Sequence, residues 1–241
     1  MVQINKVYFT YPNDKTVLQN ISFTVPTGQI VAILGANGAG KTTLLKLIAG
    51  LLVPDVGSQI IIDGMAPQEI AGKIAFISEA GTYFNELTPK AYGTFLEDFF
   101  PAFDMAYFEL LLEFFHLEER PMKKMSKGQK AKVEIAAGMA KKVPYIVMDE
   151  PFVGKDMFTR QDFMQALSGT LSGKETIFIT THEISEIENF VDRIIILKEN
   201  ELAVDITLDA LRQEGKTIQE LMKEVIGYRE DGFYSFLDAG E

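Results

Sequence analysis

The segment 35–42 limits the possible folds of this chain more than any other feature. It reads Gly-Ala-Asn-Gly-Ala-Gly-Lys-Thr, follows an apolar run at residues 30–34, and precedes a stretch with helical spacing from Lys41 to about Leu52. Glycines let consecutive backbone N–H groups turn toward a phosphate, and the helix start adds the positive end of its dipole. The order buried strand, G-x-x-x-x-G-K-[ST] loop and helix therefore predicts an α/β domain with a phosphate-binding loop.

The residues of this loop have distinct expected roles. Lys41 supplies a positive charge to the β- and γ-phosphates of a nucleotide, and Thr42 offers a hydroxyl to Mg²⁺. The other residues expected to bind the nucleotide are Gly35, Asn37, Gly38, Ala39, Gly40 and Thr43. The alternative, a glycine-rich turn that only ends a strand, leaves the lysine and threonine at these spacings unexplained.

Two adjacent carboxylates follow a second apolar strand, expected at residues 145–148. They are Asp149 and Glu150. Ligands of open α/β sheets bind at the carboxyl ends of the strands. Asp149 suits Mg²⁺, directly or through water, because this cation prefers oxygen ligands. Glu150, one residue further, is expected to polarise a water molecule in line with the γ-phosphate. Alone, such acids would be interpreted as a solvated strand end; together with the phosphate loop they predict a catalytic site.

Composition excludes several other classes of protein. The 241 residues include 23 Lys and Arg against 34 Asp and Glu, giving a net charge of −11, which disfavours nucleic acid and bare membrane as primary partners. Without cysteine, disulfides, cysteine-ligated zinc, iron–sulfur clusters and thiol nucleophiles are excluded. The two histidines, His116 and His182, leave little material for a histidine metal site. Residues 1–6 lack a signal-peptide pattern, and no apolar run approaches the ~18 residues of a membrane span, so we expect a cytoplasmic chain.

Strand and helix signals alternate on both sides of an aromatic-rich, helix-permissive segment. Residues 83–115 contain eight of the 18 phenylalanines and three of the eight tyrosines, and helical spacing continues after Ser126 to Lys142. We expect strands at residues 3–9, 18–25, 29–34, 59–62, 73–77, 145–148, 175–181 and 194–197. This order predicts an α/β core at residues 1–79 and 143–205, a helical insertion at 80–142, and a helical tail at 206–241.

A third motif carries a resemblance to a known family. Met125-Ser126-Lys127-Gly128-Gln129 opens an expected helix, with Ser126 lying 23 residues before Asp149. With the phosphate loop and the paired carboxylates, it makes residues 1–205 similar to the nucleotide-binding subunits of ATP-binding cassette (ABC) transporters, whose signature is L-S-G-G-Q. The resemblance implies a P-loop NTPase (RecA-like) core with a mainly parallel sheet, an N-terminal antiparallel β-subdomain and an inserted α-helical subdomain.

In that family the signature binds the γ-phosphate of ATP held by the opposite subunit. The resemblance therefore assigns Ser126, Gly128 and Gln129 to nucleotide binding across a dimer. The sequence departs from the pattern at Met125, a mild exchange for leucine, and at Lys127, which adds a positive charge near a phosphate. A Ser-Lys-Gly turn that only caps a helix is the alternative.

Further family positions can be placed one at a time. His182 follows a strand and resembles the histidine that contacts the γ-phosphate and orients the water. Asp156 resembles the aspartate of the inter-subunit loop. Tyr11 resembles the aromatic that stacks on adenine, with Tyr8 as the competing candidate. Glu79 stands where the family often has a glutamine that contacts Mg²⁺, so it is expected to ligate the metal while adding negative charge.

The resemblance implies an ATPase that uses ATP and Mg²⁺, dimerises head to tail with a like or unlike cassette, and drives a separate transmembrane permease from the inner face of the membrane. The Ser-Lys-Gly-Gln form resembles bacterial exporter-type subunits. We expect the docking surface for the permease in residues 83–115, with Phe84, Tyr92 and Phe95 as candidates. Alternatives are a soluble ABC-type ATPase acting on nucleic acid or ribosomes, and a nucleotide-binding regulatory module without turnover.

Overall fold

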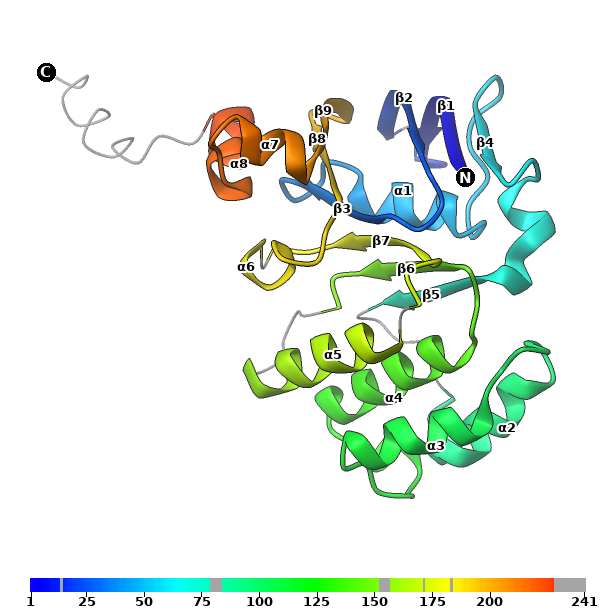
Figure 1. Cartoon of the computed structure of the whole chain (residues 1–241). Helices are drawn as coiled ribbons and strands as arrows, with labels where there is room; N and C mark the ends of the chain where they lie inside the picture. The colour runs from blue at the N-terminus through cyan, green and yellow to red at the C-terminus, as the bar shows by residue number, and fades with distance from the viewer. Residues whose placement is uncertain (14, 79–83, 152–156, 171, 183, 228–241) are drawn as a thin grey trace, which may run out of the picture.

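A computed structural model describes residues 1–13, 15–78, 84–151, 157–170, 172–182 and 184–227. Two β-sheets and the helices around them form the molecule (Figure 1). The strands are β1 (Val2–Thr10), β2 (Thr16–Val25), β3 (Ile30–Gly35), β4 (Gln59–Ile62), β5 (Ile74–Ser78), β6 (Tyr145–Asp149), β7 (Thr176–Thr180), β8 (Arg193–Lys198) and β9 (Glu201–Thr207). The helices are α1 (Lys41–Ile48), α2 (Pro89–Glu97), α3 (Met105–Phe114), α4 (Lys127–Ala140), α5 (Met157–Thr170), α6 (Ile184–Ile187), α7 (Leu208–Gln213) and α8 (Ile218–Ile226), with short 3₁₀ turns at Pro67–Lys73 and Met122–Lys124.

The larger sheet has the strand order β5-β6-β7-β3-β8-β9, parallel except for its last strand. β3 lies in its interior and is buried on both faces after its first residue, as its continuous apolar run predicts. The smaller sheet, β2-β1-β4, is antiparallel. The α/β fold and its N-terminal antiparallel sheet are confirmed.

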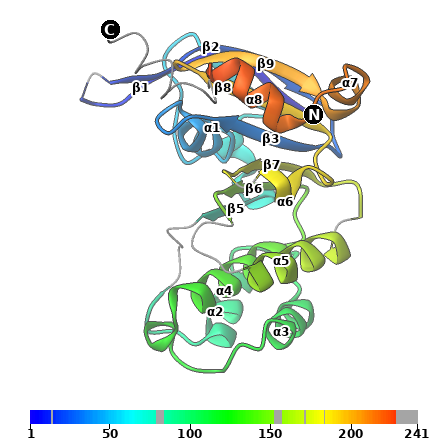
Figure 2. The same cartoon turned by 90° about the vertical axis from the view of Figure 1, so that its left-hand side faces the viewer.

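The large sheet is covered on both faces except at its edge strand β9, where every second residue is exposed. One apolar cluster fills the space between the two sheets around α1, and a second joins the opposite face to α4, α5, α7 and α8. Figure 2 shows α7 and α8 beside β8 and β9, and α2 and α3 beyond α4 on the side away from the sheets. This layering leaves the carboxyl ends of the central strands open, which is where ligands bind in such folds.

Two elements differ from the sequence predictions. β9 was not predicted; it pairs antiparallel with β8, so the helical stretch begins at Leu208 rather than at residue 206. The first helix ends at Ile48 rather than near Leu52, because Gly50 adopts φ +74° and the N–H of Leu51 bonds back to the carbonyl of Lys46.

Among the described residues, no helix is long and apolar enough to cross a membrane.

Candidate functional site

The phosphate loop joins β3 to α1 through a backbone that needs glycine. Gly35 has φ +147°, and a Cβ there would lie 2.4 Å from the carbonyl oxygen of Leu197 on β8. Gly40 has φ +100°, and its Cβ would lie 2.7 Å from the carbonyl oxygen of Val17 on β2. Any larger residue would push the loop away from the strands that hold it. The loop therefore keeps its shape by close backbone packing.

Lys41 is the first residue of α1, and its side chain is held inside the loop. Its Nζ donates to the carbonyl oxygens of Gly35 at 2.9 Å and Ala36 at 3.2 Å. Burial lowers the pKa of Lys41, while Glu150 and Asp149 act in the opposite direction. The ammonium group therefore lies in the loop with two carboxylates close enough to stabilise its charge.

A hydrogen-bond network links the phosphate loop to the end of β6. Thr42 Oγ1 donates to Asp149 Oδ1 at 3.0 Å, and Thr180 Oγ1 donates to the same oxygen at 2.8 Å. The strand register explains why Thr180 contacts Asp149: the two residues are paired between β6 and β7, and Asp149 is also paired with Ser78 on β5. Hydroxyl and carboxylate oxygens are the donors that Mg²⁺ prefers.

This donor set fits Mg²⁺ better than a cation that needs a full protein cage. Among the described residues, no three His, Asp or Glu side chains form a group that could hold a metal ion. Mg²⁺ is usually held by one or two protein oxygens together with water and substrate phosphates, so Thr42 and Asp149 beside a phosphate loop suit it.

Glu150 follows directly after β6 with a left-handed backbone, φ +50°. Its N–H donates to Thr180, and His182 Nε2 lies 3.1 Å from its Oε1. Burial raises the pKa of Glu150, opposed mainly by His182 and Lys41. Both carboxylate oxygens are shielded from solvent, and neither accepts a hydrogen bond of good geometry from the described part of the chain. Such a group has capacity left for a proton donor such as water.

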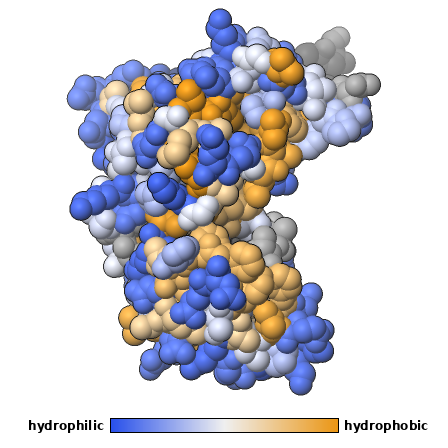
Figure 3. All heavy atoms as spheres, turned by 90° about the vertical axis from the view of Figure 1, so that its right-hand side faces the viewer, coloured by the Kyte–Doolittle hydropathy of each residue, from blue (hydrophilic) through white to orange (hydrophobic). Residues whose placement is uncertain are grey.

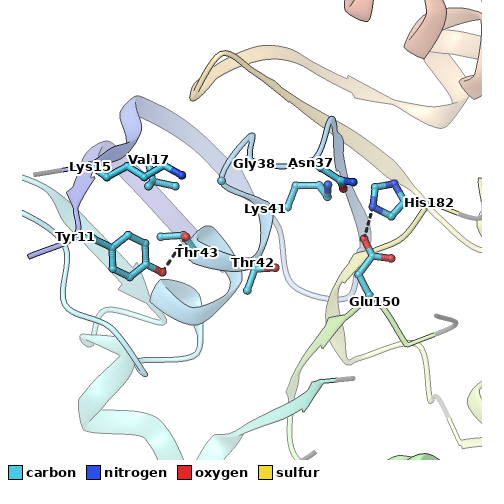
Figure 4. Close-up of a pocket in the computed structure, with 11 residues that line it drawn as sticks. Tyr11, Lys15, Val17, Asn37, Gly38, Lys41, Thr42, Thr43, Glu150 and His182 are labelled. Atoms are coloured by element: carbon cyan, nitrogen blue, oxygen red, sulfur yellow. Dashed lines mark hydrogen bonds and ion pairs between the residues drawn. The ribbon is translucent and has the colours of Figure 1, made fainter. Parts of the chain in front are cut away.

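These side chains surround one pocket of about 510 Å³ (Figure 4). Glu150 and His182 lie at one end, Tyr11 and Thr43 at the other, and Lys41 between them. The full lining is Tyr11, Lys15, Val17, Asn37, Gly38, Gly40, Lys41, Thr42, Thr43, Glu150 and His182. Two of these, Lys15 and Val17, were not predicted; their closeness to Tyr11 in sequence was the available signal.

Tyr11, rather than Tyr8, is the aromatic residue at the pocket. Its hydroxyl lies 3.2 Å from Thr43 Oγ1, and its ring meets Phe9 edge to face with centroids 4.8 Å apart. Tyr8 does not line the pocket and is 43% exposed.

The signature residues lie elsewhere on the molecule. Ser126 caps α4, on the opposite side of β5, β6 and β7 from α1, and none of Ser126, Gly128 and Gln129 lines the pocket. Gly35 and Ala39 belong to the loop but not to the pocket lining. Glu79 and Asp156 lie outside the described residues, so their expected roles stay predictions.

Comparisons with known proteins place this site in a family. The sequence matches the ABC transporter family over residues 18–153. It is 31% identical over 208 residues to the ABC transporter ATP-binding protein YtrB of Bacillus subtilis (strain 168), covering 84% of this chain and 71% of YtrB. The solved structure of an ATP-binding subunit of an ABC transporter superimposes with a TM-score of 0.83 at 28% identity, covering 94% of this chain and 99% of that one.

A second solved structure is a dimeric ATP-binding cassette in a post-hydrolysis state, bound to ADP and Pi. It superimposes with a TM-score of 0.73 at 26% identity, covering 86% of this chain and 99% of that one. The chain therefore belongs to the ABC transporter family, as an ATP-binding and ATP-hydrolysing subunit of a transporter.

Proposed function

We propose that the pocket binds Mg-ATP with its phosphates in the phosphate loop, and that Glu150 is the general base for hydrolysis. The observation that carries this proposal is the meeting of Lys41, Thr42, Glu150 and His182 around a single pocket, with Asp149 hydrogen-bonded to Thr42 beside it. Elements far apart in sequence bring these groups together, and each offers an atom that suits phosphate, metal or water.

Each side chain has a separate task in this proposal. Lys41 binds the β- and γ-phosphates as a positive charge. Thr42 and Asp149 would hold Mg²⁺, which would neutralise negative charge on the phosphates. The raised pKa of Glu150 moves its proton affinity toward the range useful for accepting a proton from the attacking water. His182, beside Glu150, orients that carboxylate and contacts the γ-phosphate.

The base of the nucleotide extends toward the other end of the pocket. Tyr11 offers an aromatic face there, and stacking on a base tolerates any base because each has a π-face. Lys15 and Val17 line the same end, so the pocket has room and apolar surface for adenine.

We propose that the ATP site is completed by the signature residues of a second cassette, which is a copy of this chain. Ser126 and Gly128 do not line the pocket, and α4, which they begin, lies on the opposite side of β5, β6 and β7 from α1, so the ATP they serve belongs to another subunit. A two-fold dimer would bring each signature to the partner's phosphate loop. A related cassette has been solved as a dimer with ADP and Pi.

The transporter also needs a membrane-spanning partner, and we propose that it docks on an aromatic surface of the helical part. Phe84, Phe95 and Phe99 form this surface, with ring centroids 4.9 and 4.8 Å apart. Phe84 is 50% and Phe99 61% exposed, and Figure 3 shows hydrophobic residues gathered over this part of the molecule. The expectation for Tyr92 was wrong: it is 3% exposed, because it faces the interior of the helical part. Docking there would hold the subunit at the inner face of the membrane.

The test of this proposal is Glu150→Gln, which keeps the size of the side chain but cannot accept the proton. We expect ATP affinity close to that of the parent, hydrolysis at least ~100-fold slower, and an ATP-dependent dimer in light scattering. Parent-like turnover would assign the water to another residue, such as Glu79 or His182. A protein that stays monomeric with ATP would exclude the copy-to-copy dimer.

A further inference from the structure

Arg120 lies directly behind the signature turn and contacts it through one side-chain atom. Its Nη2 donates to Gln129 Oε1 at 3.0 Å, and its Nη1 lies 3.3 Å from Glu118 Oε2. The chain between Arg120 and the signature is short and contains the 3₁₀ turn Met122–Lys124. The guanidinium is therefore anchored on one side by Glu118 and on the other by the first turn of α4.

The oxygen that Arg120 contacts also shapes the signature itself. Gln129 Oε1 accepts from the N–H of Ser126 at 3.0 Å, and the N–H of Gln129 donates to Ser126 Oγ at 3.2 Å. This is a reciprocal capping box. Since Arg120 and the Ser126 N–H are both donors, the side-chain oxygen of Gln129, and not its nitrogen, must point toward them.

The orientation of Ser126 follows from this arrangement. Its Oγ accepts from Gln129, so the hydroxyl hydrogen remains available to donate to a ligand outside the turn. If the Gln129 side chain turned away, the N–H of Ser126 would lose its acceptor, and the backbone that carries the capping serine would be held only by the bond from the Gln129 N–H to Ser126 Oγ. Arg120 prevents that rotation by adding a charged donor to the same oxygen.

Stability alone is a poor explanation for this arginine. The capping box is complete without it, and α4 is anchored further along by buried residues such as Val133 and Ala137. Arg120 Nε is shielded from solvent and, within the described ranges, has no hydrogen-bond partner. An unsatisfied donor of this kind reduces the net gain from placing a guanidinium here.

We infer that Arg120 is a positioning residue: it orients Gln129, and through it the Ser126 hydroxyl and the start of α4, toward the nucleotide of the partner subunit. The inference rests on the proposed function, in which Ser126 and Gly128 meet the partner's ATP. It also changes the expected role of Gln129, whose side-chain oxygen supports the turn instead of contacting the nucleotide.

The test uses the full chain with Glu150→Gln, so that the ATP-bound dimer accumulates. Adding Arg120→Ala should weaken ATP-dependent dimerisation about tenfold per site, and about a hundredfold for a dimer with two such sites. ATP affinity of the dilute monomer and the midpoint of thermal unfolding should stay close to the parent. Arg120→Lys, which keeps one donor and the charge, should restore part of the loss. In a double-mutant cycle, Arg120→Ala should add little to Gln129→Ala.

Two controls separate the possible outcomes. Lys124→Ala removes a neighbouring exposed charge without touching Gln129, so equal weakening in this variant would overturn positioning in favour of a general charge effect. Gly128→Asp places a carboxylate where only Ser126 Oγ is near, so the fold can accommodate it. A negative charge is favourable at a helix start, but here it should repel the partner's phosphates and block dimerisation. If Gly128→Asp blocks the dimer while Arg120→Ala behaves as the parent, the inference is wrong and the proposed function stands. If Gly128→Asp dimerises normally, the signature does not meet the partner's ATP, and the proposed function itself is wrong.

Discussion

Thr42 Oγ1 donates a 3.0 Å hydrogen bond to Asp149 Oδ1, and this contact joins the first turn of α1 to the end of β6. The two residues are 107 positions apart in the sequence. The fold of the chain places the two oxygens next to each other, and Thr180 on β7 holds the Asp149 carboxylate with a second hydrogen bond. Binding of a small cation between them therefore needs little rearrangement of the backbone.

The first prediction concerns this pair. Thr42→Val keeps the branched shape but removes the hydroxyl, so the Mg²⁺ concentration needed for half-maximal ATP binding should rise about tenfold or more. ATP binding in the presence of a chelator should change much less. Titrations of nucleotide binding against Mg²⁺ measure both, with Thr24→Val on an exposed position of β2 as the control. Equal loss with and without Mg²⁺ would argue against a metal role for Thr42.

The second prediction concerns the aromatic surface of Phe84, Phe95 and Phe99. Phe84→Asp and Phe99→Asp should each greatly reduce co-purification with the membrane partner, because a carboxylate cannot be buried in an apolar interface without a partner. The ATPase rate of the isolated subunit should stay near the parent value. Val56→Asp, at a fully exposed valine outside the helical part, is the matched control. Wild-type recovery of the complex by folded variants would disprove docking at this surface.

The third prediction concerns the packing of α4 on β5. A Cβ at Gly138 would lie 2.4 Å from Cδ1 and 2.6 Å from Cγ1 of the buried Ile77. Gly138→Ala should lower the free energy of unfolding by about 1–3 kcal/mol, measured by urea denaturation. Gly169→Ala, in a helix position with open space around it, should be neutral or stabilise by up to ~1 kcal/mol. Equal effects in both variants would mean that helix propensity, and not crowding, decides.

The fourth prediction concerns pH. Burial lowers the pKa of Lys141, although Glu134 acts in the opposite direction, and its Nζ lies 4.2 Å from the ring centroid of Phe100. Between this lowered pKa and the ordinary value of 10.5, the unfolded chain binds more protons than the folded one. The contribution of Lys141 to stability should therefore rise with pH in this alkaline range. The unfolding free energy of Lys141→Met, compared with the parent over that range, should lack this rise; parallel curves would contradict it.

Much of the site could be predicted because its chemistry is local in sequence. The phosphate loop, the two acids at the end of β6 and the histidine after β7 each stand at the carboxyl end of a buried strand, and parallel strands bring these ends to one edge of the sheet. Tyr92 could not be assigned correctly, because aromatic residues in a helical segment look alike until the neighbouring helices decide which face is covered. β9 was missed although its sequence alternates: Leu202, Val204 and Ile206 are partly buried and the residues between them are exposed.

The contact of Arg120 with Gln129 could not be predicted from the sequence. It precedes the signature and carries no motif of its own, so only the folded turn shows that it shares an oxygen with Ser126. The spacing of a motif predicts which backbone groups lie together, but not which side chain outside the motif donates a hydrogen bond to it.

The left-handed backbone of Glu150 has a consequence for how the protein would respond to selection. Glutamate at positive φ costs roughly 1 kcal/mol, while asparagine and glycine tolerate this conformation, and the shielded carboxylate adds to the cost. Glu150→Asn should therefore raise the melting temperature while stopping hydrolysis. Laboratory evolution that rewards heat resistance alone would tend to replace this residue, whereas selection for transport would retain it at the expense of thermal tolerance.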